Sequence, residues 1–248
     1  MTDKESIDKQ LKESLDDKSE RWNFANDILY KMCKENPKHE NEHVIVAKIW
    51  LIGRSYAAAI ERTEKARESN DFYYEKVVKL LETKIHDELE IHDELDRIIA
   101  ELNNGEKYER LSRDNLDEAL EAHNFLMKEF NKITGKDNRS LVSKYLHFHC
   151  PSMFYIYDTR AVSAINEITV KMKEKSKEFK ELRKPDLEEG DYDKCYSDFC
   201  AKVLALQEYI EKEHGQKVTP RTIDSFLLHY YNRKIKRKIK PRLSPSSQ

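Results

Sequence analysis

Glycine and proline are scarce in this sequence of 248 residues, which contains 5 of the first and 6 of the second. Because these two residues supply most tight turns, their scarcity argues against an all-β fold and against a wound α/β sheet. Charged residues make up 37% of the chain and apolar residues 38%, a balance typical of amphipathic helices with solvated outer faces. We therefore expect an all-α protein of about eight helices, arranged as one globular helical domain or as two packed helical lobes.

Long apolar runs and paired cysteines are also missing. The sequence has no apolar run of about 18 residues, the length that a membrane-spanning helix requires, and the residues after Met1 are polar or charged. We therefore expect neither a membrane span nor a signal peptide. The absence of a CxxC pair and of disulfide-type spacing favours a reducing cytoplasm. The four cysteines are Cys33, Cys150, Cys195 and Cys200.

Several motifs that identify common enzyme classes are absent. There is no glycine-rich phosphate loop, no GxSxG and no HExxH, which excludes the commonest nucleotide-binding and hydrolase classes. His86, Glu90 and Asp93 fall on one helix face and would permit a divalent metal, but a solvated charged face is the favoured interpretation. His147 and His149 point about 200° apart on a helix, so they do not share an ion unaided. We expect no metal and no organic cofactor.

The distribution of charge and of helix signals predicts the domain organisation. Residues 1–18 are polar with few apolar anchors, so we expect a flexible segment there, followed by a helical domain over 19–240 and a flexible tail over 241–248. A boundary between sub-lobes is expected near 104–112. Three capping residues and two glycine stops mark helix ends; they are Asn41, Asp158, Thr219, Gly135 and Gly215.

Two surfaces are candidates for binding a partner. The formal net charge is −2, but cations are concentrated near the end of the chain. Such a segment contacts phosphate or an acidic protein, or else it is a solvated helix end whose charges complement the helix dipole. Its seven cations are Arg233, Lys234, Lys236, Arg237, Lys238, Lys240 and Arg242. The second surface is a long charged helix expected from Asp71 to Asn103, which would suit a structural interaction protein.

The segment from Ser140 to Ile165 carries the chemistry of greatest interest. Lys144 lies on an otherwise apolar helix, and Asp158 lies at the start of the next helix. A desolvated lysine has a lowered pKa, and its neutral amine is a nucleophile. A carboxylate at a helix N-terminus is kept ionised by backbone N–H groups and by the helix dipole. These two groups suffice to cleave an N-glycosidic bond, because the carboxylate stabilises the positive sugar while the amine attacks C1′ to give a Schiff base.

The order of helix, lysine, turn, extended segment and helix-capping aspartate resembles the helix–hairpin–helix DNA glycosylases, and most closely their divergent 8-oxoguanine glycosylase branch. The last helix, from Thr219 to Tyr231, is also similar to the C-terminal helix of that branch. The resemblance implies an all-helical glycosylase-like fold, with Lys144 as the nucleophile and Asp158 as the assisting carboxylate. It also implies DNA as a partner and extrusion of a damaged or modified base.

Further residues follow from this hypothesis. The family carries a glycine-rich hairpin before the lysine, whereas this chain has no glycine from Arg139 to Ser143, so contacts with the DNA backbone must come from side chains. We expect Lys136, Arg139 and Arg160 to make these contacts. Residues expected to line the base pocket or to stack on the base are His147, Phe148, Tyr157 and Tyr230.

Other interpretations of the same residues stay open. Lys144 is also explained as a surface lysine whose head lies in water, and Asp158 as a plain helix cap. The missing glycines favour a non-catalytic helical module that binds nucleic acid or protein on the same scaffold, for example in prokaryotic genome defence.

Overall fold

The computed structural model describes residues 3–16, 23–61, 71–82 and 91–239. Within these ranges it contains eleven α-helices and one π-helix and no β-strand, which confirms the all-α prediction. The chain forms two compact units. Unit 1 comprises Met1–Ser19, Ile156–Lys184 and Asp198–Gln248, and unit 2 comprises Glu20–Tyr155 and Pro185–Ser197. The expected sub-lobe boundary near 104–112 lies inside unit 2.

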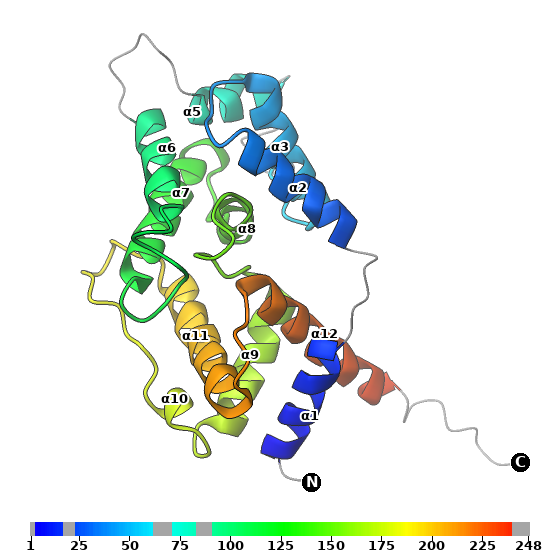
Figure 1. Cartoon of the computed structure of the whole chain (residues 1–248). Coiled ribbons are helices and arrows are strands. Elements are labelled where there is room, and N and C mark those ends of the chain that lie inside the picture. Colours follow the sequence, from blue (N-terminus) through cyan, green and yellow to red (C-terminus); the bar gives the residue numbers. More distant parts are fainter. Residues whose placement is uncertain (1–2, 17–22, 62–70, 83–90, 240–248) are drawn as a thin grey trace, which may run out of the picture. The chain divides into compact units, whose positions relative to one another are not determined.

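Unit 2 is organised around one buried helix. Its elements are α2 (Asn23–Glu35), α3 (Glu42–Ser55), η2 (Tyr73–Val78), α5 (Lys79–Leu81), α6 (Ile91–Leu102), α7 (Leu116–Thr134) and α8 (Arg139–His149). Helices α2, α3 and α7 all pack against α8 (Figure 1). Because α8 is covered on several sides, every residue from Leu141 to His149 is buried. Beyond the exposed Pro151, Met153 to Tyr155 are again buried and are not helical, within the segment that the sequence predicts to be aromatic and extended.

Unit 1 contains α1 (Asp3–Asp16), α9 (Thr159–Met172), α10 (Lys177–Lys180), α12 (Pro220–Ile239) and most of α11 (Lys194–His214). Helix α12 packs against both α9 and α1 (Figure 1). The helix at Asp3–Asp16 differs from the flexible segment that the sequence predicts for residues 1–18. The reason is that Ile7 and Leu11, one turn apart, are 1% and 0% exposed, so two apolar residues attach the helix to the unit.

The predicted helix ends agree with the structure where local side chains decide them. Asn41 caps α3, with its Oδ1 atom 3.2 Å from the Val44 amide nitrogen. Gly135 ends α7 with a left-handed φ of 70°, and Gly215 follows α11 with a φ of 64°. In α12, the Thr219 hydroxyl accepts a hydrogen bond of 3.1 Å from the Thr222 amide. These signals are confirmed because each depends on residues within one turn.

The expected long helix from Asp71 to Asn103 is wrong as a continuous element. The π-helix η2 leads directly into the short α5, which ends at Leu81. Its C-cap residue, Glu82, has an extended backbone with a ψ of 126°. Helix α6 begins at Ile91 and packs against α7, whereas η2 packs against α3. The two segments therefore pack against different helices. This break removes the long uninterrupted surface that a purely structural interaction protein was expected to use.

None of the described helices combines the length and the apolar character needed to cross a membrane. All four cysteines are free thiols, and Cys195 is the exposed one.

Replacing Asn41 by alanine is expected to lower the free energy of unfolding by about 1 kcal/mol, because the Val44 amide loses its capping acceptor. Asn41→Asp supplies the same acceptor and serves as the matched control. Urea denaturation followed by circular dichroism measures the difference. An Asn41→Ala midpoint equal to that of the wild type would show that the cap does not stabilise α3.

Candidate functional site

Lys144 lies in the buried core of unit 2. The residue is 1% exposed, and its amine nitrogen lies 2.5 Å from the hydroxyl oxygen of Ser140, one turn earlier on α8. This burial excludes a surface lysine with its head in water. Because removing an ammonium group from water favours the neutral amine, the location suits the nucleophile expected from the sequence.

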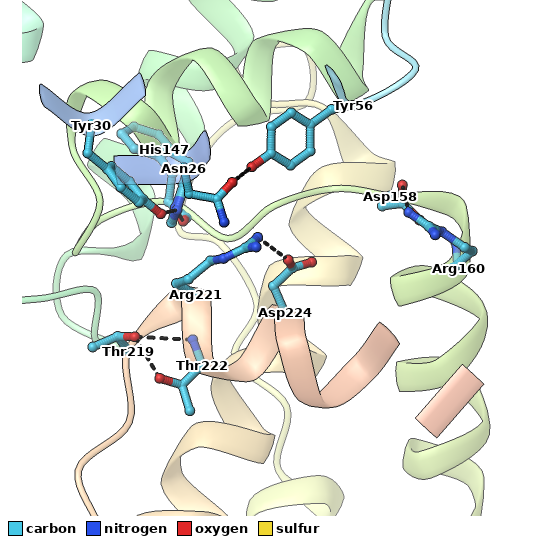
Figure 2. A network of polar contacts seen from close by, with 11 residues as sticks. Asn26, Tyr30, Tyr56, His147, Asp158, Arg160, Thr219, Arg221, Thr222 and Asp224 are labelled. Atoms are coloured by element: carbon cyan, nitrogen blue, oxygen red, sulfur yellow. Dashed lines mark hydrogen bonds and ion pairs between the residues drawn. The ribbon is translucent and has the colours of Figure 1, made fainter. Parts of the chain in front are cut away.

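Asp158 belongs to unit 1, where it caps α9 as predicted. Its Oδ1 atom accepts hydrogen bonds from the Arg160 backbone amide at 2.9 Å and from Arg160 Nε at 3.0 Å. The contact with Asp158 raises the pKa of Arg160, and Figure 2 shows the two side chains together. The Asp158 side chain is 16% exposed. Its pairing with Lys144 stays a prediction.

His147 is held in one tautomer by two neighbours in unit 2. Its Nδ1 atom lies 2.8 Å from the carbonyl oxygen of Phe154, which only accepts, so Nδ1 carries the proton. Nε2 is then the acceptor for the Tyr30 hydroxyl, at 2.6 Å (Figure 2). The imidazole is fully buried. The residue is fixed in orientation rather than free to rotate toward solvent.

Aromatic rings and one amide gather around His147. The ring centroid of Tyr30 lies 4.8 Å from that of Phe148 and 5.6 Å from that of His147. The Tyr56 ring lies 5.5 Å from Phe148, and its hydroxyl donates to Oδ1 of Asn26 (Figure 2). We call these five residues, from α2, α8 and the C-cap of α3, the Asn26 cluster. The cluster supplies planar faces and hydrogen-bonding groups in one place.

Two members of the Asn26 cluster, His147 and Phe148, were expected from the sequence to bind substrate. They are neighbours in the chain, so that role stays a prediction. Asn26 and Tyr30 were missed, because their i, i+4 spacing on one helix face does not distinguish them from ordinary core residues. Helix α3 ends at Ser55 and leaves Tyr56 at its C-cap.

The other expected pocket residues, Tyr157 and Tyr230, lie in unit 1. The Tyr157 ring packs edge-on against Phe199, with centroids 5.2 Å apart. The Tyr230 hydroxyl lies 2.9 Å from the Lys171 amine and 3.2 Å from Oε1 of Glu167. Both aromatic residues therefore have structural contacts inside their own unit, and their role in binding a base stays a prediction.

The cations expected to contact DNA differ in their surroundings. Lys136 is exposed, but Arg139 makes a two-point ion pair with Asp193 at 2.5 and 2.6 Å. Burial favours the neutral form of Asp193, but the hydrogen bonds from Arg139 outweigh burial and lower its pKa. Arg160 is engaged by Asp158, as described above. Only Lys136 among the three combines exposure with no carboxylate pair in the described part of the chain.

The basic tail is partly neutralised inside unit 1. Arg233 pairs with Glu13, and Lys234 pairs with Glu167. Burial raises the pKa of Glu167, but the hydrogen bonds from Lys171 and Lys234 outweigh burial and lower the pKa to about 2. This carboxylate is therefore ionised at neutral pH. The side chains of the other five tail cations lie outside the described residues.

Unit 2 also contains a buried polar cluster that the sequence did not indicate. His39 joins Asp96 and Tyr145: Nδ1 lies 2.5 Å from Oδ1 of Asp96, and Nε2 lies 2.5 Å from the Tyr145 hydroxyl. The amine of the nearby Lys48 donates to a backbone carbonyl. Burial lowers the pKa of Lys48 to about 8 and that of His149 to well below its usual value. Unit 2 thus holds a second desolvated lysine besides Lys144.

The metal interpretation of His86, Glu90 and Asp93 is not tested, because His86, Glu90 and the side chain of Asp93 lie outside the described residues. Across the part of the chain that the structure describes, no group of three or more His, Cys, Asp or Glu side chains is arranged to hold a metal ion.

A surface hollow of about 280 Å³ lies between α6 and α7. Four glutamates and two cations contribute to its lining, and burial and neighbouring carboxylates raise the pKa of Glu121. A surface with this excess of carboxylates repels phosphate, so the hollow does not suit a nucleic-acid backbone. The charged lining residues are Glu94, Glu101, Glu118, Glu121, Arg97 and Lys107.

Acid is expected to destabilise unit 2 through His123. This residue is fully buried and stacks on Tyr196, with ring centroids 3.7 Å apart. Burial lowers its pKa to about 4. Since the unfolded chain takes up the proton near pH 6.5, stability is retained above that pH and lost as the pH falls toward about 4. The loss from His123 alone is roughly 2 kcal/mol between pH 7 and pH 5.

His123→Phe keeps the stacked ring and removes the titration. Urea midpoints of wild type and variant, measured at both pH values, isolate the contribution of His123 from that of other groups. An equal loss of stability in both proteins would contradict the assignment.

No protein-family model, curated protein or solved structure matches this chain. Its function is therefore inferred from the side chains themselves, above all Lys144 and the Asn26 cluster.

Proposed function

We propose that this protein binds an extruded damaged or modified base of DNA and cleaves its N-glycosidic bond, with Lys144 as the amine nucleophile and Asp158 as the stabilising carboxylate. The observation that supports this proposal most is the burial of Lys144, whose amine is shielded from water and lies 2.5 Å from the Ser140 hydroxyl. Shielding favours the neutral form that attacks carbon.

The reaction requires few groups. The neutral Lys144 amine forms a bond to C1′ while the bond from C1′ to the base breaks, and the base leaves with the bonding electrons and takes up a proton. The amine nitrogen then loses its proton as the sugar ring opens, which gives the Schiff base. Water hydrolyses this imine and releases Lys144. The negative charge of Asp158 would stabilise the positive charge that develops on the sugar.

The Asn26 cluster supports the binding half of the proposal. Every base has two flat faces, and stacking on aromatic side chains contributes about 1–3 kcal/mol per base. Tyr30 and Tyr56 are half-buried, so their rings lie at the edge of the core. Lys136 would anchor the phosphate backbone, and the paired Arg139 and Arg160 would contact DNA only by exchanging a carboxylate partner for phosphate.

A second candidate function has a specific observation in its favour. Lys144 and Asp158 each have a partner within the protein, Ser140 for the first and Arg160 for the second. Groups that serve packing and capping in this way suit a non-catalytic module that binds nucleic acid or protein without breaking a bond. The two functions differ in whether a covalent intermediate forms.

Trapping with borohydride distinguishes them. Wild-type protein incubated with a duplex containing 8-oxoguanine or an abasic site is expected to give a reduced covalent adduct, because borohydride reduces the Schiff base. Lys144→Gln is expected to abolish the adduct, and Lys79→Gln, at an exposed position of α5 with no assigned role, to preserve it. Asp158→Asn keeps a capping side chain but removes the charge, so we expect slower trapping without loss of folding.

Peptide mapping of the wild-type adduct makes the test independent of variant stability. Mapping to Lys144 supports the assignment, whereas mapping to the other desolvated lysine, Lys48, would overturn it. Absence of any adduct, together with salt-dependent DNA binding that Lys144→Gln leaves unchanged, would select the non-catalytic function.

A further inference from the structure

The amide of Asn26 has one hydrogen-bonding group without a partner. Asn26 is 7% exposed, and its Nδ2 atom contacts no acceptor in the part of the chain that the structure describes. A buried N–H group loses its hydrogen bonds to water on folding, so native proteins rarely leave one unsatisfied. An acceptor on a ligand would satisfy this donor.

The oxygen of the same amide already has a hydrogen-bond partner. The Tyr56 hydroxyl donates to Oδ1 of Asn26, as Figure 2 shows. Because Oδ1 accepts from the Tyr56 hydroxyl, the group of the amide that is left for a ligand is the Nδ2 donor. A free asparagine would offer both a donor and an acceptor to a base edge.

The surroundings of Nδ2 restrict the ligand further. Tyr30 lies one turn after Asn26 on α2, and its hydroxyl proton is given to Nε2 of His147, whose own proton is given to the Phe154 carbonyl. The Tyr30, Tyr56 and Phe148 rings pack together at 4.8–5.5 Å. The ligand beside Nδ2 thus meets flat apolar faces and neutral hydrogen-bonding groups, which suit a planar uncharged heterocycle.

We propose that Asn26 selects a keto base: its Nδ2 atom donates to a carbonyl oxygen on the edge of the base, and the position disfavours an exocyclic amino group. The proposal rests on the proposed function for the class of ligand, a nucleobase, and adds which edge of the base is recognised. The discrimination arises because an amino group would face the Nδ2 donor without an acceptor between them.

The test compares two bases of the same size that differ in this group, hypoxanthine with a carbonyl and adenine with an amino group. Binding of each free base to the full-length wild-type chain is measured by calorimetry or by chemical-shift titration; a free base has no glycosidic bond, so no chemistry contributes. We expect hypoxanthine to bind at least about tenfold more tightly than adenine.

Two variants examine the mechanism. Asn26→Asp keeps the acceptor for Tyr56 but replaces the donor by a carboxylate oxygen, so hypoxanthine affinity is expected to fall by about 10- to 100-fold. The same substitution at the exposed Asn232 of α12 is the matched control. Tyr56→Phe frees Oδ1, which lets the amide rotate and present its oxygen. We expect this variant to bind adenine more tightly than the parent does, a gain that loss of folding does not produce.

Equal affinity of the parent chain for the two bases would overturn the proposal, as would an Asn26→Asp chain that keeps the preference for hypoxanthine. The readout is separate from catalysis. Selective binding without a borohydride adduct supports base recognition by Asn26 and contradicts the proposal that Lys144 cleaves the glycosidic bond. An adduct at Lys144 whose formation does not depend on Asn26 supports the reaction and removes this inference.

Discussion

The enclosure of α8 is the constraint on which the rest of unit 2 depends. Helices α2, α3 and α7 cover it, so its polar side chains cannot use water as a hydrogen-bonding partner. Each must find a partner within the protein or be destabilising. Lys144 is satisfied by Ser140, Tyr145 by His39, and His147 by Phe154 and Tyr30. The packing of α2 and of the segment before α3 is therefore specified by polar contacts as well as by apolar burial.

The same enclosure affects the protonation of the lysine side chains in unit 2. Removal from water favours the neutral amine of a lysine, and both Lys144 and Lys48 are removed from water in unit 2. Lys48 shows that burial by itself does not define a catalytic group, since it also serves to hold a backbone carbonyl. What distinguishes Lys144 is its place on the same helix as His147 and Phe148 of the Asn26 cluster.

Ion pairing limits how the protein can bind nucleic acid. Arg139, Arg160, Arg233 and Lys234 all lie against carboxylates. A paired cation contributes less to phosphate binding than a free one, because the carboxylate must first be displaced. Broad electrostatic attraction to phosphate is therefore weak in the described residues, and the DNA binding proposed above would depend more on the fit of the base than on charge.

Helix caps and stops followed from the sequence alone, because Asn41, Gly135 and Asp158 act on backbone groups within one turn. The all-α class followed from composition for a similar reason, since turn residues are required locally. The break at Glu82, the attachment of α1 and the donor of Asn26 did not follow. Each depends on which distant helix a residue meets, and only the tertiary structure decides that. Burial of Lys144 was determined partly by the sequence and partly by the tertiary structure. The apolar neighbours of Lys144 indicated its burial, but packing by α2, α3 and α7 was needed to enclose the side chain.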